Sequence, residues 1–173
     1  MVVRPPRRQQ GLLYLALLFW VAISAIAIAG QSNWWVLQRQ RDKEQELLFA
    51  GDQFRRAIAS YYQNSPGPTK RYPATLEALI RDTRILPARQ HLRRIYADPV
   101  TNELTWGTVT ASDGGVMGVF SLSRALPLKR TGFSQSDEDF TGKTSYADWV
   151  FIYYGDRTRY IPPRMLIWQP SSD

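Results

Sequence analysis

Two hydrophobic patterns follow one another in the first 62 residues. Between Gly11 and Gly30, 17 of 20 positions are apolar and none is charged, which is the length that a helix needs to cross a bilayer. This run predicts the transmembrane half of a helix over 12–33. Over 34–62 the apolar residues recur at the period of a helix with one apolar face; they include Leu47, Phe54, Ile58 and Tyr61. Because no proline interrupts 12–62, we expect one continuous helix.

A polar collar over 38–46 separates the two patterns. Its sequence, QRQRDKEQE, is polar on every side of a helix, and its opposite charges three residues apart contribute only a few tenths of a kcal/mol per pair. The simpler interpretation is a solvated stalk that lifts a globular head off the membrane. The sharper one is a surface that pairs with neighbouring subunits, in which Arg39 and Arg41 are partner contacts.

The pattern changes after a turn at 64–68, which contains two prolines and a glycine. Residues 72–80 predict a short second helix. From residue 92 onward, short apolar runs alternate with turn residues at roughly ten-residue intervals, which predicts an antiparallel meander. Its expected strands are 93–96, 104–109, 116–122, 149–154 and 165–168. The predicted fold class is therefore α+β: a long N-terminal membrane-spanning helix packed on a small antiparallel β-sheet.

These boundaries divide the chain into four parts. Residues 1–11 form a cytoplasmic basic leader, and 12–33 form the transmembrane half of the long helix. Residues 34–62 form the stalk and the amphipathic half of that helix. The remaining residues, 63–173, form a globular α/β head.

Charge sets the expected orientation. Lysine and arginine total 22 against 15 acidic residues, a net charge of +7. Three arginines and no acid lie among the first ten residues, so the positive-inside rule keeps this arm in the cytoplasm. We expect a single-pass protein of the bacterial inner membrane with a periplasmic head. A cleaved secretory signal is the alternative, because Ala25-Ile26-Ala27 has the small residues of a cleavage site.

The composition leaves few kinds of active site. Cysteine is absent, which excludes disulfides, thiolate metal sites and cysteine nucleophiles. The one histidine, His91, lies among arginines and has no evident serine and carboxylate partners in the sequence. We therefore expect a surface histidine, no catalytic constellation and a protein that is not an enzyme.

The junction QGLLYLA at 10–16, followed by the uninterrupted helix and the small sheet, resembles a type IV pilin and, more closely, a pseudopilin of type II secretion. The head adds Tyr72-Pro73 and the Asp98-Pro99 turn, which are similar to pseudopilin heads. The resemblance implies that prepilin peptidase cuts after Gly11 and that Leu12 becomes a methylated N-terminus. It also implies a non-enzymatic role in protein transport, with other pilin-like subunits, the inner-membrane assembly platform and the lipid bilayer as partners.

The chain departs from the family at one position. The glutamate that is fifth in the processed family chain corresponds here to Ala16. Family members that lack this glutamate are minor or tip subunits, so the resemblance implies such a position. The alternative is an uncleaved, single-pass membrane-anchored periplasmic domain, for which an enzymatic or DNA-binding role stays open.

Two charged segments are candidate binding sites. The first is an acidic loop whose oxygen ligands suit Ca²⁺, and major secretion pseudopilins carry calcium in a comparable late loop; its candidate ligands are Asp137, Glu138, Asp139 and Asp148. A solvated acidic turn is the alternative, and we expect no other cofactor. The second is a run of five arginines over 81–94 that faces only Asp82. Since aromatic residues are not interleaved there, nucleic acid is disfavoured, and Arg93 and Arg94 are predicted to contact an acidic partner or anionic lipid.

Overall fold

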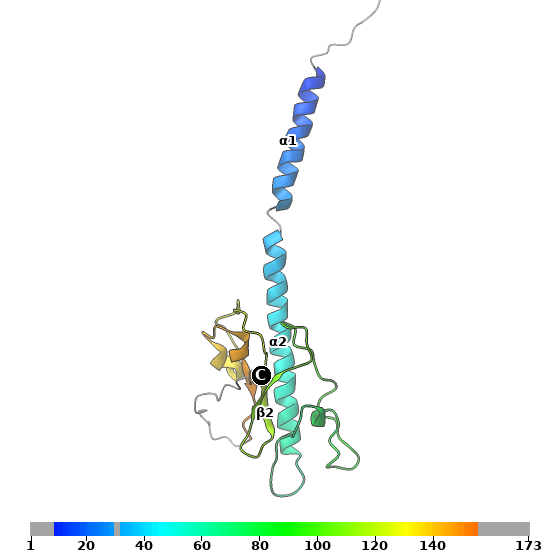
Figure 1. The fold of residues 1–173 in the computed structure, drawn as a ribbon, viewed down its shortest axis with the longest axis vertical. Helices are drawn as coiled ribbons and strands as arrows, with labels where there is room; N and C mark the ends of the chain where they lie inside the picture. The colour runs from blue at the N-terminus through cyan, green and yellow to red at the C-terminus, as the bar shows by residue number, and fades with distance from the viewer. Residues whose placement is uncertain (1–8, 30–31, 156–173) are drawn as a thin grey trace, which may run out of the picture. The chain divides into compact units, whose positions relative to one another are not determined.

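The computed structural model describes residues 9–29 and 32–155, and side chains are described from 11 to 24 and from 34 to 155. The chain divides into two compact units between Asp42 and Lys43, and each is described by itself. The described part is α+β, as predicted, with long helices and one small antiparallel sheet (Figure 1).

The first unit contains helix α1 (Gln9–Ala29) and the beginning of helix α2 (Ser32–Gln63). The apolar side chains of α1 are exposed, with exposed fractions of 73% for Leu12 and 72% for Trp20. The junction of the predicted continuous helix, residues 30–31, lies outside the described residues. So do the side chains of 25–33, which belong to the predicted membrane-spanning half. Among the described residues, no helix combines the length and the hydropathy that crossing a membrane requires.

In the second unit, α2 provides one side of the hydrophobic core. The predicted apolar stripe is confirmed: Leu47, Phe54 and Ile58 have no exposed surface, and Tyr61 is 6% exposed. Small residues between them let the sheet approach closely. At Gly51 an added Cβ would stand 2.4 Å from the ring of Phe151, so only glycine fits there. The amphipathic pattern of α2 therefore determines how the head packs.

Three strands form the sheet that covers this stripe: β1 (Gly107–Thr110), β2 (Val116–Phe120) and β3 (Val150–Ile152), antiparallel in the order β1-β2-β3. Gly107 pairs with Phe120, and Gly118 pairs with Ile152. Gly114, in the turn between β1 and β2, has a φ of 82°, a conformation that favours glycine. Three of the five predicted strands are thus confirmed, although each is shorter than expected.

Other predicted elements differ from the structure. Residues 93–96 are not a strand, because Tyr96 offers its carbonyl to the indole N–H of Trp106 at 2.8 Å and packs its ring against Phe54. The predicted second helix is a single 3-10 turn, η1 (Glu77–Leu79). Two further 3-10 segments, η2 (Gln135–Phe140) and η3 (Tyr146–Asp148), precede β3. The predicted strand 165–168 lies outside the described residues.

The stalk interpretation expected a collar that is solvated along its whole length. The structure differs at Glu44. Glu44 is only 3% exposed, because its carboxylate accepts the backbone N–H groups of Leu128 and Lys129 and, at 2.9 Å, the hydroxyl of Tyr146. A charged residue in a polar run is thus buried by a loop more than 80 residues away in sequence. The head therefore begins within the collar.

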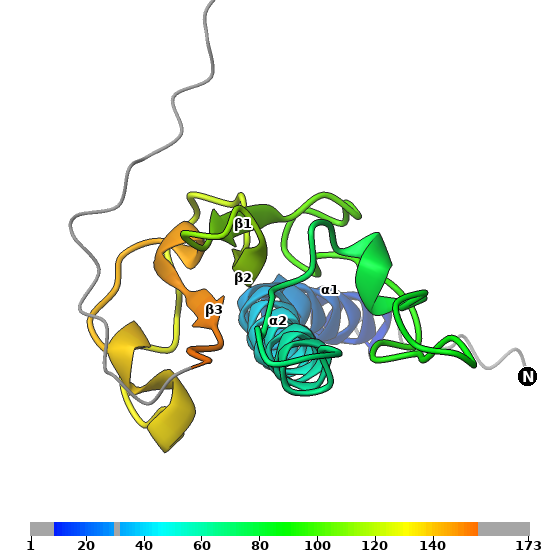
Figure 2. The ribbon, with the colours of Figure 1, turned by 90° about the horizontal axis from the view of Figure 1, so that it is seen from below.

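Figure 2 looks along α2 and shows how the head surrounds it. The strand β3 and the segment with η2 lie on one side of the helix, and η1 with the loop that follows it lies on the other. This second loop, together with the last turns of α2, contains a cluster of hydrogen-bonded polar side chains.

Candidate functional site

The cluster is built where the loop 80–92 meets the end of α2. Asp82 and Arg89 exchange backbone hydrogen bonds of 2.8 and 3.1 Å, which closes the loop on itself. The N–H groups of His91 and Leu92 both donate to the carbonyl of Leu79 at 2.9 Å. Since Leu79 and Leu92 are buried in the core, the loop is fixed to the helix, and His91 is held against it.

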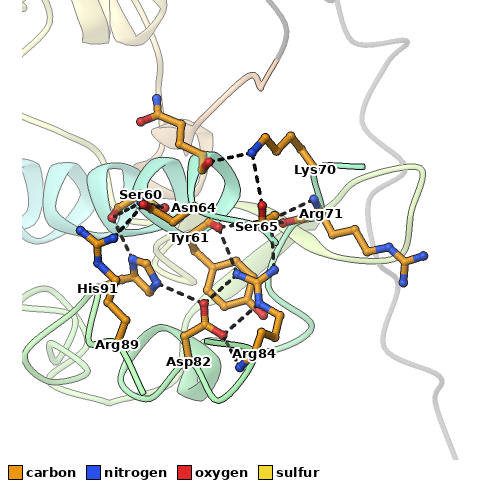
Figure 3. Close-up of polar contacts among 11 residues, drawn as sticks. Ser60, Tyr61, Asn64, Ser65, Lys70, Arg71, Asp82, Arg84, Arg89 and His91 are labelled. Carbon is orange, nitrogen blue, oxygen red and sulfur yellow. Dashed lines mark hydrogen bonds and ion pairs between the residues drawn. The ribbon is translucent and has the colours of Figure 1, made fainter. Parts of the chain in front are cut away.

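Three side chains form a continuous hydrogen-bonded chain (Figure 3). Ser60 Oγ lies 2.8 Å from Nδ1 of His91, and Nε2 of His91 lies 3.3 Å from Oδ2 of Asp82. The His91 side chain is fully buried, and that of Asp82 is 1% exposed. A carboxylate can only accept, so Nε2 carries the ring hydrogen and Nδ1 of the neutral ring accepts the hydroxyl of Ser60.

The protonation states follow from the surroundings. Hydrogen bonds from Arg84 lower the pKa of Asp82 to about 2, although burial opposes this shift. Burial lowers the pKa of His91 from its ordinary value, and the hydrogen bond to Asp82 only partly offsets it. At neutral pH Asp82 is therefore an anion and His91 is a neutral imidazole.

Arg84 holds the carboxylate in place and joins it to the helix. Its Nε and Nη2 donate to the two oxygens of Asp82 at 2.9 and 2.8 Å. Its Nη groups also donate to Ser65 Oγ at 3.0 Å and to the carbonyl of Tyr61 at 3.1 Å, and its guanidinium stands 3.5 Å from the centre of the Tyr61 ring. Carbonyls at a helix C-terminus lack partners within the helix, and a cation satisfies them well.

A second pair of side chains lies beside Ser60. The amide nitrogen of Asn64, the residue that directly follows α2, donates to the carbonyl of Ser60 at 2.7 Å and lies 3.5 Å from Ser60 Oγ. Arg89 donates to the amide oxygen of Asn64 at 2.7 Å, which fixes that amide with its nitrogen toward Ser60. Arg89 is exposed, whereas Ser60 and Asn64 are half-buried.

The prediction of a surface histidine without serine and carboxylate partners is wrong. The three residues are 31 and 9 positions apart, and packing of the loop brings them together. Two sequence signals are compatible with the site: Asp82 is the one acid among the arginines of 81–94, and Asn64 follows Ser60 by four residues at the end of the long helix.

The predicted calcium residues lie on η2 and η3. Asp137 is buried and accepts hydrogen bonds from Arg55 Nη2 at 2.7 Å and Ser134 Oγ at 2.6 Å. Glu138 and Asp139 are exposed on η2, and Asp148 ends η3. Within the described ranges, no group of three or more histidine or acidic residues is placed to hold a metal ion. Calcium binding stays a prediction, and any calcium site there would compete with Arg55 for Asp137.

The predicted partner-contact arginines are all exposed, namely Arg39, Arg41, Arg93 and Arg94. The basic run of 81–94 is altered by the fold, because Arg84 is committed to Asp82. Its surface charge therefore comes from the other four arginines. The predicted processing residues, Gly11 and Leu12, lie within α1, and Leu12 is exposed.

Comparisons with known protein families, with curated proteins and with solved structures find no match for this chain. The α+β fold, the apolar N-terminal segment and the polar cluster of the head therefore carry the functional argument.

Proposed function

We propose that this chain is a pseudopilin-like subunit of a type II secretion or type IV pilus-like assembly, in a minor or tip position. The observation that carries the proposal is the packing of the amphipathic end of α2 on a three-stranded antiparallel sheet. This is the arrangement of helix and sheet that the resemblance implies. Its assembly role requires no catalysis.

Anchoring in the inner membrane is part of the proposal. The ten Leu, Ile, Val and Phe residues of 11–30 favour insertion by about 3–6 kcal/mol at −0.3 to −0.6 kcal/mol each. The described apolar side chains of α1 are exposed to a degree that is unusual for a protein in water, and lipid would cover them. Ala16 supports a minor position, because it cannot provide the carboxylate that pairs with the N-terminal amine of a neighbouring subunit.

The test is co-expression of the full chain with a prepilin peptidase, followed by mass spectrometry of the membrane protein. We expect residues 1–11 to be removed and Leu12 to become the methylated N-terminus. Gly11→Ala should reduce cleavage, and Gly11→Leu should block it. A mature protein that retains Met1 would refute processing and favour an uncleaved anchored domain.

That uncleaved domain, with an enzymatic head, is the second candidate, and one observation favours it: the Ser60–His91–Asp82 hydrogen-bonded chain. A head fragment that starts at residue 64 could not test this second candidate, because the fragment would lack Ser60 and the core residues of α2, Leu47 to Tyr61. The unit that packs together begins at Lys43, and the full chain is the safer material.

A further inference from the structure

We propose that Ser60 is an activated nucleophile that takes an acyl group from carboxylic esters, with His91 as its general base and Asp82 as the residue that orients the imidazole. This site goes beyond the assembly role. It lies in the head and does not depend on cleavage at Gly11, so the two proposals stand or fall separately.

The direction of the hydrogen bonds is the first argument. Nε2–H of His91 points at Asp82 Oδ2, which leaves the lone pair of Nδ1 directed at Ser60 Oγ, 2.8 Å away. A nucleophilic hydroxyl needs a base within about 2.6–3.2 Å, and the base needs a third group that fixes its tautomer. Both conditions are met here, with the roles of the two ring nitrogens set by Asp82.

The behaviour of other serines in this chain is the second argument. A serine on a helix commonly bonds to the carbonyl four residues earlier, as Ser24 of α1 does to Trp20 at 2.8 Å. Ser60 Oγ instead meets the imidazole of His91. The loop is already attached to the helix by Arg84, through Tyr61 and Ser65. Holding the loop therefore does not require the contact between Ser60 and His91.

The carbonyl oxygen of the substrate needs a hydrogen-bond donor when it becomes negatively charged. Asn64 Nδ2 donates to the backbone carbonyl of Ser60 at 2.7 Å and, over a longer 3.5 Å, to Ser60 Oγ, so a side-chain N–H donor lies next to the hydroxyl. In the tetrahedral intermediate, the N–H that meets Oγ in the free protein would instead donate to the oxygen of the ester carbonyl. Arg89 holds the amide through Oδ1, so the donor is positioned before the substrate arrives, which is the condition for stabilising a developing oxyanion.

The reaction follows from these placements. Ser60 Oγ attacks the carbonyl carbon of the ester, and its proton passes to Nδ1 of His91. The bond between the carbonyl carbon and the alcohol oxygen breaks, and the departing alkoxide takes the proton from Nδ1. Water then attacks the acyl-Ser60 ester with His91 again as base, which releases the carboxylic acid and restores the hydroxyl.

The experiment treats the full-length chain in detergent micelles at pH 7.5 with a fluorophosphonate probe. This reagent forms a bond from Oγ to phosphorus as fluoride leaves. Peptide mapping should find the adduct on Ser60, and Ser60→Ala should lose it. Ser112→Ala is the control, because Ser112 is an exposed serine in the turn between β1 and β2 and lies outside the cluster; this variant should react like wild type. His91→Gln should react at least about 100-fold more slowly than wild type, because a general base usually contributes a factor of that size or more.

A second measurement uses p-nitrophenyl acetate and follows release of p-nitrophenolate. Wild type and Ser112→Ala should release it faster than Ser60→Ala, and the rate should decline as acid protonates His91. Circular dichroism of each variant confirms that the head is folded. The proposal is overturned if folded wild type forms no adduct, if the adduct is on another residue, or if His91→Gln reacts at the wild-type rate.

Discussion

Replacing Arg84 by methionine should destabilise the head more than any other single charge deletion near the polar cluster. Methionine keeps the length and much of the volume of the side chain but removes its five donors. Asp82, at 1% exposure, would lose both guanidinium bonds and keep only His91 and backbone donors. The carbonyl of Tyr61 and Ser65 Oγ would also lose a donor.

The magnitude follows from Asp82. The fall of its pKa from 3.8 to about 2 corresponds to roughly 2 kcal/mol in favour of the ionised form, at 1.36 kcal/mol per pKa unit. That figure already includes the opposing burial, which remains when the arginine is gone. Removing one partner of a buried ion pair typically costs about 3–5 kcal/mol. Since Arg84 is 26% exposed, we expect about 2–4 kcal/mol, because water screens part of the interaction.

The assay is urea unfolding of wild type, Arg84→Met, Asp82→Asn and the double variant, read as a double-mutant cycle. The double variant should be less destabilised than the sum of the two single variants. If Arg84→Met costs less than about 1 kcal/mol and shows no coupling to Asp82→Asn, the pair is an ordinary surface ion pair and this reasoning is refuted.

Acid should act on the same cluster in two steps. A group with a lowered folded-state pKa binds its proton more readily in the unfolded chain, so it destabilises the fold as the pH drops. For His91 the loss begins below about pH 6.5, its unfolded value. For Asp82 it begins near pH 4 and ends near pH 2. In Arg84→Met the second step should shrink or move upward in pH.

Three further predictions concern the rest of the chain. Phe54→Ala removes a ring with no exposed surface and should lower the free energy of unfolding by about 3–5 kcal/mol; a loss below about 1 kcal/mol in urea unfolding would contradict the packing of α2 on the sheet. If the loop of Asp137–Asp139 binds calcium, a chelator should lower the melting temperature of the purified chain, and an unchanged melting curve favours the plain acidic turn. Single cysteines at Arg39 and Arg41 should crosslink to pilin-like subunits in intact membranes, since both positions are exposed; capture of no such subunit at either would refute the assembly proposal.

The parts of the fold that the sequence predicts well are those set by local patterns. The apolar stripe of α2 is visible because four large residues repeat at helical spacing, and all four are buried. The turn at Ser112–Gly115 is visible because aspartate and glycine are favoured there; Asp113 accepts the N–H of Gly115 at 3.0 Å. Such features depend on residues close together in sequence, so a short stretch of the chain is enough to predict them.

The parts that sequence reasoning missed depend on distant contacts. Nothing in the sequence around Glu44 distinguishes it from the other polar residues of the collar. It is buried because the loop at Leu128 packs on it and donates a backbone N–H to its carboxylate. The segment 93–96 has residues that favour a strand, but the carbonyl of Tyr96 accepts a hydrogen bond from the indole N–H of Trp106 and not from a neighbouring strand. His91 acquires its partners in the same way, through the packing of Leu79 and Leu92 beneath the loop.

The two proposed activities depend on different residues of the chain. Ile58 and Tyr61 are buried in the core, while Ser60 and Asn64, which directly follows α2, meet the loop of His91 and Arg89. The exposed arginines of the collar, Arg39 and Arg41, belong to the first compact unit, whereas Ser60 belongs to the second. Substitutions at Ser60 therefore leave both the core stripe and the collar intact. A loss of reactivity at Ser60 and a loss of crosslinking at Arg41 would consequently report on different properties of the molecule, and either can fail without the other.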